Sequence, residues 1–299
     1  MRLNTIIEQI MNGLQKGSVY ALVALGYTMV YGIVKLINFA HGDFIMVGAY
    51  TTIFSIPLLA SIGCPLWLSI IVAILICSLL GILTEKVAYK PLRQSSRITS
   101  LITAIAISLL LQNLFAKLFT SSARMFTQVF IFDVPTIIIG TVKLHKVSIL
   151  TCAISIVVMV CLQLFVKKTK MGKAMRAVSE NPDAAKLMGI SINRVVSFTF
   201  AIGAGLAGLA AIIFCSYSMS FDPYVGGSLG IKAFVAAVLG GIGSIPGAML
   251  GGFLIGLSES MTQTFLSSEW VDIIVFSILI FILLFKPSGL MGKMTSEKV

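Results

Sequence analysis

The sequence predicts an all-α polytopic membrane protein with roughly eight transmembrane segments, at least one of them broken or re-entrant. Of its 299 residues, 58% are hydrophobic and only 11% are charged, whereas soluble domains carry about 25% charged residues. Several apolar stretches reach the ~20 residues that a helix needs to cross a bilayer, so the spans are helices and not barrel strands. One further stretch of this kind is interrupted by glycine and proline.

The apolar segments follow one another with only short polar intervals between them. We therefore expect residues 1–299 to form a single transmembrane domain. In chain order, the segments are residues 18–34, 38–60, 66–88, 98–118, 147–166, 195–219, 230–260 and 268–285.

Lysine and arginine gather in three intervals between or after these segments. Because cytoplasmic loops carry an excess of these residues, we place all three intervals in the cytoplasm. The net charge of +11 then reflects membrane topology and does not indicate a nucleic-acid partner. The intervals contain Lys86, Lys90, Arg93 and Arg97; Lys167, Lys168, Lys170, Lys173, Arg176, Lys186 and Arg194; and Lys286, Lys293 and Lys298.

The orientation of the N-terminus depends on the first two segments. Lys86 lies in a cytoplasmic interval, and successive spans cross the membrane in alternating directions. Traced back from Lys86, this puts the N-terminus outside if residues 18–34 and 38–60 both cross the membrane. It puts the N-terminus inside if one of them is re-entrant. The sequence leaves both alternatives open.

The second segment begins with an unusually polar stretch, INFAHGDFIMVGAY (37–50). A charge at the bilayer centre costs about 2.5–3.5 kcal/mol on insertion scales, so such residues lie in the bundle interior or near an interface. In one interpretation, Asn38 and His41 line a polar route, with Gly42 allowing close backbone approach. In the other, they and Asp43 form an N-terminal cap of the span at the membrane interface.

The interval 119–146 separates the fourth segment from the fifth and faces outside in this topology. It contains runs of β-branched and aromatic residues. It is expected either to form a small hairpin or to lie on the membrane surface.

The interval 167–194 is predicted to hold two short helices on the cytoplasmic face. Asn181 can cap a helix whose first residue is Pro182, and Gly189 can end it in a left-handed conformation. Leu187 and Met188 lie three and four residues after Ala184, so the three side chains share one face of this helix. So short a helix is stable only when docked. It docks either on a partner protein or on the membrane surface.

The seventh segment must leave and return on the same side of the membrane for the eighth to end in the cytoplasm. Its sequence LGGIGSIPGAMLGG (239–252) is too rich in glycine and proline for an unbroken helix. In one alternative, the break forms a gate or a binding region. In the other, it is a kink that the glycines pack tightly. For the first alternative, the predicted residues are Gly240, Gly241, Gly243, Ser244 and Pro246. Lys232 and Glu259 flank the break, and we expect them to reach an interface rather than to pair.

Enzymatic chemistry is not expected, and no catalytic or metal-binding residue is predicted. An intramembrane enzyme would need a Ser/His, paired Asp or H-E-x-x-H constellation, whereas the only histidines are His41 and His145. The five cysteines lie in or beside apolar stretches and form no C-x-x-C pair. No phosphate-binding loop of the G-x-x-x-x-G-K-[ST] type is present, so the chain should bind no cofactor itself, and any ATP is hydrolysed by another chain.

Four stretches resemble branched-chain amino acid permeases of the LivH type, which belong to ABC transporters. They occur in order and cover most of the chain. They are GSVYALVALGYTMVYGIVKLINFAHGDFIMVGAY (17–50), MGKAMRAVSENPDAAKLMGI (171–190), KAFVAAVLGGIGSIPGAMLGG (232–252) and FKPSGLMG (285–292).

The stretch DAAKLMG also resembles the E-A-A-x-x-x-G loop of ABC-importer permeases, with Asp in place of Glu. The downstream I-x-L-P part of that pattern is absent, because FTFAIG (198–203) stands in its place. In those permeases the loop is a coupling helix seated in a cleft of the ATPase. The resemblance therefore implies that residues 167–194 are a cytoplasmic coupling loop within the permease domain. The coupling residues are Glu180, Pro182, Asp183, Ala184, Ala185, Leu187, Met188 and Gly189.

The resemblance also implies a multi-subunit importer in the bacterial cytoplasmic (inner) membrane. This multi-pass chain, surrounded by lipid, would pair with a second, homologous permease above two ATP-binding subunits that hold ATP and Mg²⁺. An extracytoplasmic binding protein would deliver leucine, isoleucine or valine, and ATP would drive alternating access. Related permeases carry amides or urea, and no residue named above separates these substrates.

The alternative from a different class is an ion-coupled secondary transporter of amino acids or other small polar solutes. It would work alone and would need an intramembrane site for the coupling ion. Most of the acidic residues lie near the ends of spans, for example Glu85, Asp222 and Asp272, which weakens this alternative.

Overall fold

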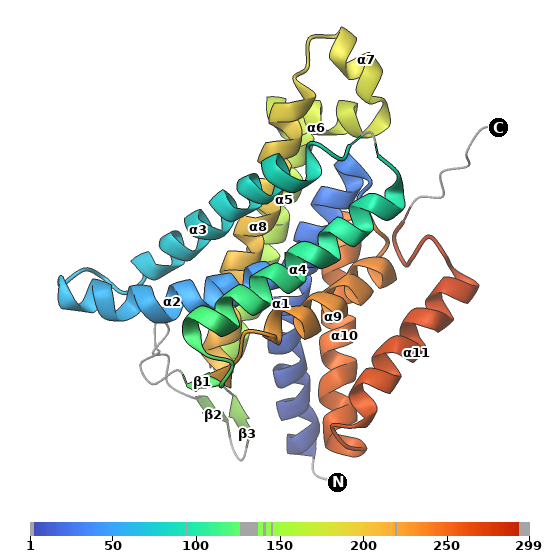
Figure 1. Ribbon diagram of the computed structural model, residues 1–299. Coiled ribbons are helices and arrows are strands. Elements are labelled where there is room, and N and C mark those ends of the chain that lie inside the picture. Colours follow the sequence, from blue (N-terminus) through green and yellow to red (C-terminus); the bar gives the residue numbers. More distant parts are fainter. Residues whose placement is uncertain are drawn as a thin grey trace.

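The computed structural model describes residues 3–93, 95–125, 137–139, 142–144, 146–218 and 220–292, and this part of the chain is almost entirely helical (Figure 1). The helices are α1 (Leu3–Val34), η1 (Phe39–His41), α2 (Asp43–Ser61), α3 (Leu68–Thr84), η2 (Glu85–Tyr89), α4 (Arg97–Phe119), α5 (Lys146–Lys168), α6 (Lys170–Glu180), α7 (Pro182–Leu187), α8 (Ile192–Tyr217), α9 (Val225–Gly240), α10 (Ile245–Phe265) and α11 (Trp270–Phe285). The strands are β1 (Arg124–Met125), β2 (Ile137–Ile139), β3 (Val142–Leu144) and β4 (Ser220–Phe221).

Among the described residues, six helices are long and apolar enough to cross a membrane, and two shorter apolar helices accompany them. This confirms the prediction of an all-α polytopic membrane protein. The six are Asn4–Val34, Phe39–Ser61, Leu68–Tyr89, Ile98–Phe119, Val147–Lys168 and Ile192–Tyr217, and the shorter ones are Val225–Gly240 and Trp270–Phe285.

Helix α1 is central to the bundle, and its predicted extent was wrong. The apolar run predicted a span over residues 18–34, but the helix begins at Leu3. Its polar first half continues the helix because its side chains find partners on neighbouring helices. The Ser260 hydroxyl donates to Gln9 Oε1 at 2.9 Å, and the Ser148 hydroxyl donates to Gln15 Oε1 at 2.7 Å.

Glycines bring helix backbones into direct contact at two seams of the bundle. Between α1 and α10, a Cβ added at Gly256 would lie 2.3 Å from the Gly17 nitrogen. Between α3 and α8, a Cβ at Gly81 would lie 2.7 Å from the Phe200 carbonyl oxygen, and one at Gly208 would lie 2.8 Å from the Ala73 oxygen. Small residues allow this close packing of membrane helices, so α3 and α8 are closely fitted to each other.

The predicted break in the seventh segment is confirmed, although the two helices around it extend further than the predicted range 230–260. Helices α9 and α10 are antiparallel, since a Cβ at Gly247 would meet the Gly240 oxygen and one at Gly251 would meet the Ala236 oxygen. At about 1.5 Å per residue, α9 is about 24 Å long and α10 about 31 Å. Only α10 therefore matches a hydrocarbon core of about 30 Å.

A C-terminal strap, residues Pro287–Gly292, covers the break. The Leu290 amide donates to the Leu239 carbonyl and the Met291 amide to the Gly240 carbonyl, both at 2.9 Å. These carbonyls belong to the last turn of α9, whose oxygens have no partner within the helix. The strap therefore satisfies the C-terminus of α9 and fixes the position of the break.

We expect Leu290→Pro to destabilise the protein, because proline has no amide hydrogen to donate to Leu239. Leaving a buried acceptor unsatisfied costs about 1–3 kcal/mol. The midpoint of thermal unfolding in detergent should fall by several degrees, whereas Leu290→Val, which keeps the amide, should leave it unchanged. Equal midpoints for both variants would show that the strap contributes nothing to stability.

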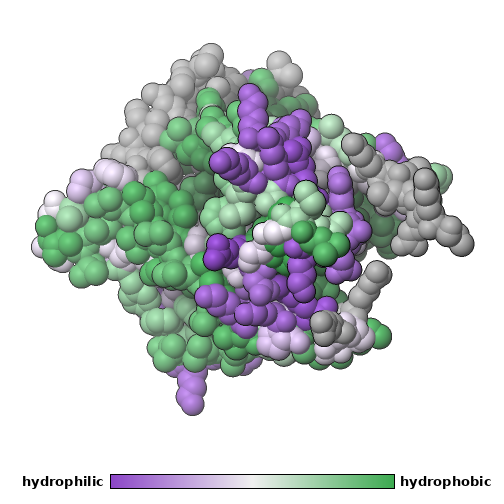
Figure 2. Space-filling view, turned by 90° about the horizontal axis from the view of Figure 1, so that it is seen from above, coloured by the Kyte–Doolittle hydropathy of each residue, from purple (hydrophilic) through white to green (hydrophobic). Residues whose placement is uncertain are grey.

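The two ends of the bundle differ in charge. Helices α6 and α7 project from one end, whereas the start of α1 and strands β1–β3 lie at the other (Figure 1). Figure 2 looks onto the α7 end, where hydrophilic residues gather near the centre, with hydrophobic residues beside them on the left. The exposed basic residues on α5 to α8 are Lys167, Lys168, Lys170, Lys173, Arg176, Lys186 and Arg194. The α7 end therefore has the charge expected of the cytoplasmic face, and α1 begins at the opposite end, as in the alternative with both first segments crossing.

In the interval 119–146, strands β2 and β3 form an antiparallel pair in which Ile137 faces Leu144. The hairpin alternative is thereby confirmed for these residues. Strand β1 pairs with β4, which links this interval to the end of α8. Residues 126–136 of the predicted interval, and His145, lie outside the described part of the chain.

Candidate functional site

The chain turns back into the bundle directly after α1. Lys35 has a positive φ of 54°, and the following residues lead down to η1. His41 lies against the C-terminal half of α1, where a Cβ added at Gly26 would be 2.2 Å from His41 Nε2. At α9, a Cβ added at Gly42 would be 2.3 Å from the Gly226 oxygen. Glycine at these positions is what allows η1 to enter the bundle.

This entry buries the polar side chains that follow it. Asn38, His41 and Asp43 are 2%, 1% and 0% exposed. Asn38 Oδ1 accepts a hydrogen bond from Tyr89 Oη at 2.8 Å, and Asp43 Oδ1 accepts one from Gln112 Nε2 at 2.9 Å. These residues thus lie in the bundle interior, and the alternative of an interfacial cap was wrong. The cap position of α2 is occupied by Gly42, which makes no side-chain cap bond.

Several of these buried groups have polar atoms without a partner. The Tyr27 ring lies 4.8 Å from the His41 ring, centre to centre. Within the described part of the chain, Tyr27 Oη, Asn38 Nδ2, His41 Nε2 and Asp43 Oδ2 are buried and make no hydrogen bond. A buried unpaired polar group costs about 1–3 kcal/mol, and its retention calls for an explanation such as a bound polar group. We call Tyr27, Asn38, His41 and Asp43 the polar cluster.

We expect Gly26→Ala to disrupt the polar cluster, because the added methyl group would meet the His41 ring. Overpacking a filled interior costs about 1–3 kcal/mol. The matched control is Gly32→Ala, less than two turns further along α1, where the added Cβ would lie 3.6 Å from the nearest atom. Thermal unfolding in detergent should show a lower midpoint for Gly26→Ala than for Gly32→Ala, and equal midpoints would contradict this packing.

The two halves of the predicted pathway lie at different levels of the bundle. His41 faces Gly26 of α1, whereas Gly243 faces Gly32, about 9 Å further along the helix axis. The structure therefore does not join Asn38, His41 and Gly42 with the glycine break in one ring of residues.

The break itself has the local conformation that its residues predict. Gly241 and Gly243 have φ values of 102° and 95°, in the region that favours glycine. Ser244 caps α10 by accepting from the Gly247 amide at 3.2 Å, and Pro246 occupies the first turn. Gly240 packs against Gly247, as described above.

The short helix predicted after Asn181 is also present, with each predicted capping contact. Asn181 Oδ1 accepts from the Asp183 and Ala184 amides, both at 3.0 Å, and Pro182 follows as the first helical residue. Gly189 ends the helix with a φ of 80°. The Ile190 amide donates to the Ala185 carbonyl at 3.0 Å, which is the bond of a Schellman cap.

One face of α7 has no partner within the described part of the chain. Ala185 is 3% exposed and packs against the protein, whereas Leu187 is 89% and Met188 82% exposed. Ala184 is exposed beside them, as are Glu180, Pro182, Asp183 and Gly189. We call Ala184, Leu187 and Met188 the α7 face. It is a small apolar surface at the end of the bundle where hydrophilic residues gather (Figure 2), and such a surface is typical of a docking site.

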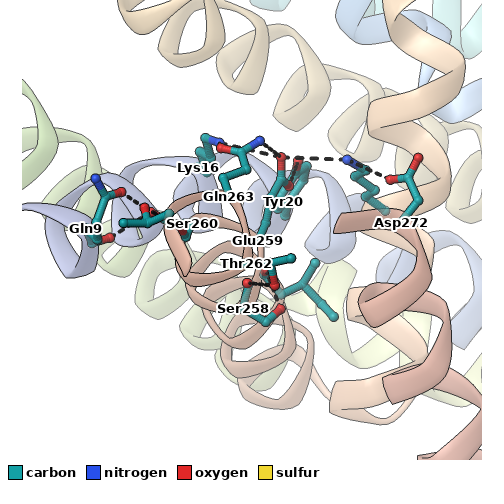
Figure 3. Close-up of polar contacts among 12 residues, drawn as sticks. Gln9, Lys16, Tyr20, Ser258, Glu259, Ser260, Thr262, Gln263 and Asp272 are labelled. Atoms are coloured by element: carbon teal, nitrogen blue, oxygen red, sulfur yellow. Dashed lines mark hydrogen bonds and ion pairs between the residues drawn. The ribbon is translucent and has the colours of Figure 1, made fainter. Parts of the chain in front are cut away.

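A second group of charged residues was misjudged from the sequence. Lys232 and Glu259 were expected to reach an interface separately, but Lys232 Nζ lies 3.6 Å from Glu259 Oε1 and 3.1 Å from Asp272 Oδ1. Lys16 Nζ lies 3.5 Å from the same Glu259 oxygen, and Tyr20 Oη donates to Glu259 Oε2 at 2.5 Å (Figure 3). Glu259 is 6% exposed, so this network joins α1, α9, α10 and α11 through a buried carboxylate.

Tyr27, Tyr89 and Gln112 were missed as neighbours of the predicted pathway residues. Each is a single polar or aromatic residue in an apolar helix, without a motif or periodic signal of its own. Only their position beside Asn38, His41 and Asp43 in the folded chain reveals them.

Comparison with known proteins gives consistent matches over nearly the whole chain. The family model described as "Branched-chain amino acid transport system / permease component" matches residues 9–283. The permease protein LivH of the high-affinity branched-chain amino acid transport system of Salmonella typhimurium is 41% identical over 303 residues, covering 98% of this chain and 97% of LivH. LivH of Escherichia coli K12 is 40% identical with the same coverage. BraD of Pseudomonas aeruginosa, the permease protein of a system with the same description, is 40% identical over 98% of both chains. No solved structure matches the chain.

Proposed function

This chain belongs to the family of branched-chain amino acid transport system permease components, and from that premise we propose how it takes part in transport. It is a multi-pass permease subunit of an ABC importer for leucine, isoleucine and valine in the bacterial inner membrane. It acts as a transport component and not as an enzyme. Alternating access of the permease is driven by separate ATPase subunits.

The observation that carries the mechanism is the exposed α7 face. Leu187 and Met188 are apolar side chains that protrude from the end of the bundle with 89% and 82% exposure. Both ends of α7 are capped, so the helix presents them in a fixed orientation. Residues 167–194 form the cytoplasmic coupling loop of the permease domain, and α7 docks in a groove of an ATPase subunit, which binds and hydrolyses MgATP. The coupling residues are Glu180, Pro182, Asp183, Ala184, Ala185, Leu187, Met188 and Gly189.

The substrate passes close to the polar cluster. Asn38 Nδ2 can donate a hydrogen bond, and Asp43 Oδ2 can accept one, which suits the carboxylate and ammonium groups of an amino acid. The glycine break, Gly240 to Pro246, acts at a second level nearer the α7 end, as a gate whose backbone conformation depends on Gly241 and Gly243.

The remaining partners follow from the same proposal. A second, homologous permease subunit completes the translocation path, two ATP-binding subunits bind at the α7 end, and an extracytoplasmic binding protein delivers the substrate at the opposite end.

The test is to purify the chain with its encoded neighbours and reconstitute it in liposomes with labelled leucine. We expect ATPase subunits to copurify, and uptake to require ATP and the binding protein. Uptake driven by a proton or sodium gradient, without any ATPase subunit, would overturn the proposal in favour of an ion-coupled secondary transporter. Competition by isoleucine and valine, but not by an amide or urea, tests the substrate class.

A further inference from the structure

A buried carboxylate lies where α3 ends, near the start of α8. Glu85 is the first residue of η2, a five-residue π-helical turn, and its side chain is 0% exposed. It pairs with the Arg93 guanidinium and accepts a hydrogen bond from the Ser197 hydroxyl at 2.5 Å. A buried carboxylate needs such partners, since an unpaired charge in the interior is strongly unfavourable. Its position therefore depends on both the α3–α4 turn and α8.

Arg93 makes a second contact with the same end of α8. Its Nη1 donates to Asn193 Oδ1 at 2.7 Å. Asn193 and Ser197 are one turn apart in the first two turns of α8, and α8 follows the Gly189 cap of α7 after two residues. The turn after α3 is thus bound by side chains to the part of α8 that a displacement of α7 would move first.

The other end of η2 reaches the polar cluster. Tyr89 is 1% exposed, its ring lies 5.3 Å from that of Phe200 on α8, and its hydroxyl donates to Asn38 Oδ1 at 2.8 Å. Glu85 and Tyr89 belong to the same short helical turn. A continuous series of specific contacts therefore runs from the start of α8 through η2 to Asn38.

We infer that Glu85, Arg93 and Tyr89 form a relay that transmits displacement of α7 and the start of α8 to Asn38 in the polar cluster. This inference rests on the proposed function, because it gives the docked α7 face a means of changing the pathway. The close glycine packing between α3 and α8 supports it, since α8 cannot shift its first turns without carrying η2 or separating Glu85 from its partners. The three are positioning residues, since none of them is placed on the substrate.

Spatial continuity alone does not demonstrate coupling, so the test measures coupling directly. In the reconstituted complex, Tyr89→Phe removes only the hydroxyl that bonds Asn38, and Ser197→Ala removes only the hydroxyl that bonds Glu85. Each should lower the number of leucine molecules imported per ATP hydrolysed by at least about tenfold. Because both variants interrupt one series of contacts, the double variant should lose no more than the worse single variant. The matched control is Ser191→Ala at the same end of α8, since Ser191 makes no cap bond.

A second measurement does not depend on transport. Hydrogen exchange of the amides of residues 38–43 should become faster in Ser197→Ala and Glu85→Gln, although both substitutions lie on other helices, and remain unchanged in Ser191→Ala. Unchanged exchange in the first two variants, or losses of coupling that multiply in the double variant, would overturn the relay. If the wild-type complex imports no leucine with ATP, the proposed function fails, whereas the relay is still judged by the exchange rates.

Discussion

Replacing Ala184 by Asp should abolish ATP-dependent leucine uptake while the chain remains folded in the membrane. Ala184 lies on the α7 face beside Leu187 and Met188 and is exposed, so a larger side chain can extend into solvent in the isolated chain. In the complex, the new carboxylate would be desolvated in an apolar groove without a partner, which costs several kcal/mol. Because each 1.4 kcal/mol is a factor of ten in affinity, binding of the ATPase subunits should weaken by at least about 100-fold. Copurification of ATPase and permease measures this directly.

Gly189→Val should give the same loss through the backbone. Gly189 has a φ of 80° with no atom within 4 Å of an added Cβ, so the effect comes from strain in the left-handed region and not from a clash. Gly63→Val is the matched control, because Gly63 also has a positive φ of 68° and open space around it but follows α2. Normal uptake in both Ala184→Asp and Gly189→Val would refute the assignment of α7 as the coupling helix. Loss of uptake in Gly63→Val as well would show that the loss in Gly189→Val comes from backbone strain at any left-handed glycine and not from the position of Gly189 after α7.

The short helix α7 was predictable because its signals are local. Asn181 accepts from amides two and three residues away, and Gly189 ends a helix that begins at Pro182. Each contact spans less than two turns, so the sequence alone contains both partners at a recognisable spacing. The break at Gly241 to Ser244 was predictable for the same reason, since positive φ values and a serine cap are properties of neighbouring residues.

The beginning of α1 and the charged network were not predictable, because their partners are distant in sequence. Gln9 bonds Ser260, and Lys16 bonds Gln263 at 2.6 Å, across about 250 residues of chain. Read locally, the polar residues before residue 18 argue against a span. In the bundle they face α5 and α10, which supply partners, so the helix continues through them. The contact between Tyr89 and Asn38 was not predictable for the same reason, since the two residues lie on different segments.

Glu259→Gln should produce the largest loss of stability among the substitutions in the charged network. The substitution keeps the size and the acceptor for Tyr20 but removes the negative charge that Lys16 and Lys232 share. Removing one partner of a buried ion pair costs about 3–5 kcal/mol. The loss should lie at the lower end of that range, because the Lys16 and Lys232 side chains are 22% and 18% exposed and Lys232 keeps Asp272. At 2–4 °C per kcal/mol, the midpoint of thermal unfolding should fall by about 10 °C.

Asp272→Asn is the control that separates burial from charge. Asp272 lies closer to Lys232 than Glu259 does, at 3.1 Å against 3.6 Å, but its side chain is 67% exposed whereas that of Glu259 is 8% exposed. Exposed ion pairs contribute about 0–1 kcal/mol, so this variant should shift the midpoint by no more than a few degrees. Adding Lys16→Met to Glu259→Gln should recover part of the loss, because the ammonium group that pairs with Glu259 at 3.5 Å is then removed as well. Equal shifts of the unfolding midpoint in Glu259→Gln and Asp272→Asn would show that the burial of Glu259 adds nothing to the stability of the network.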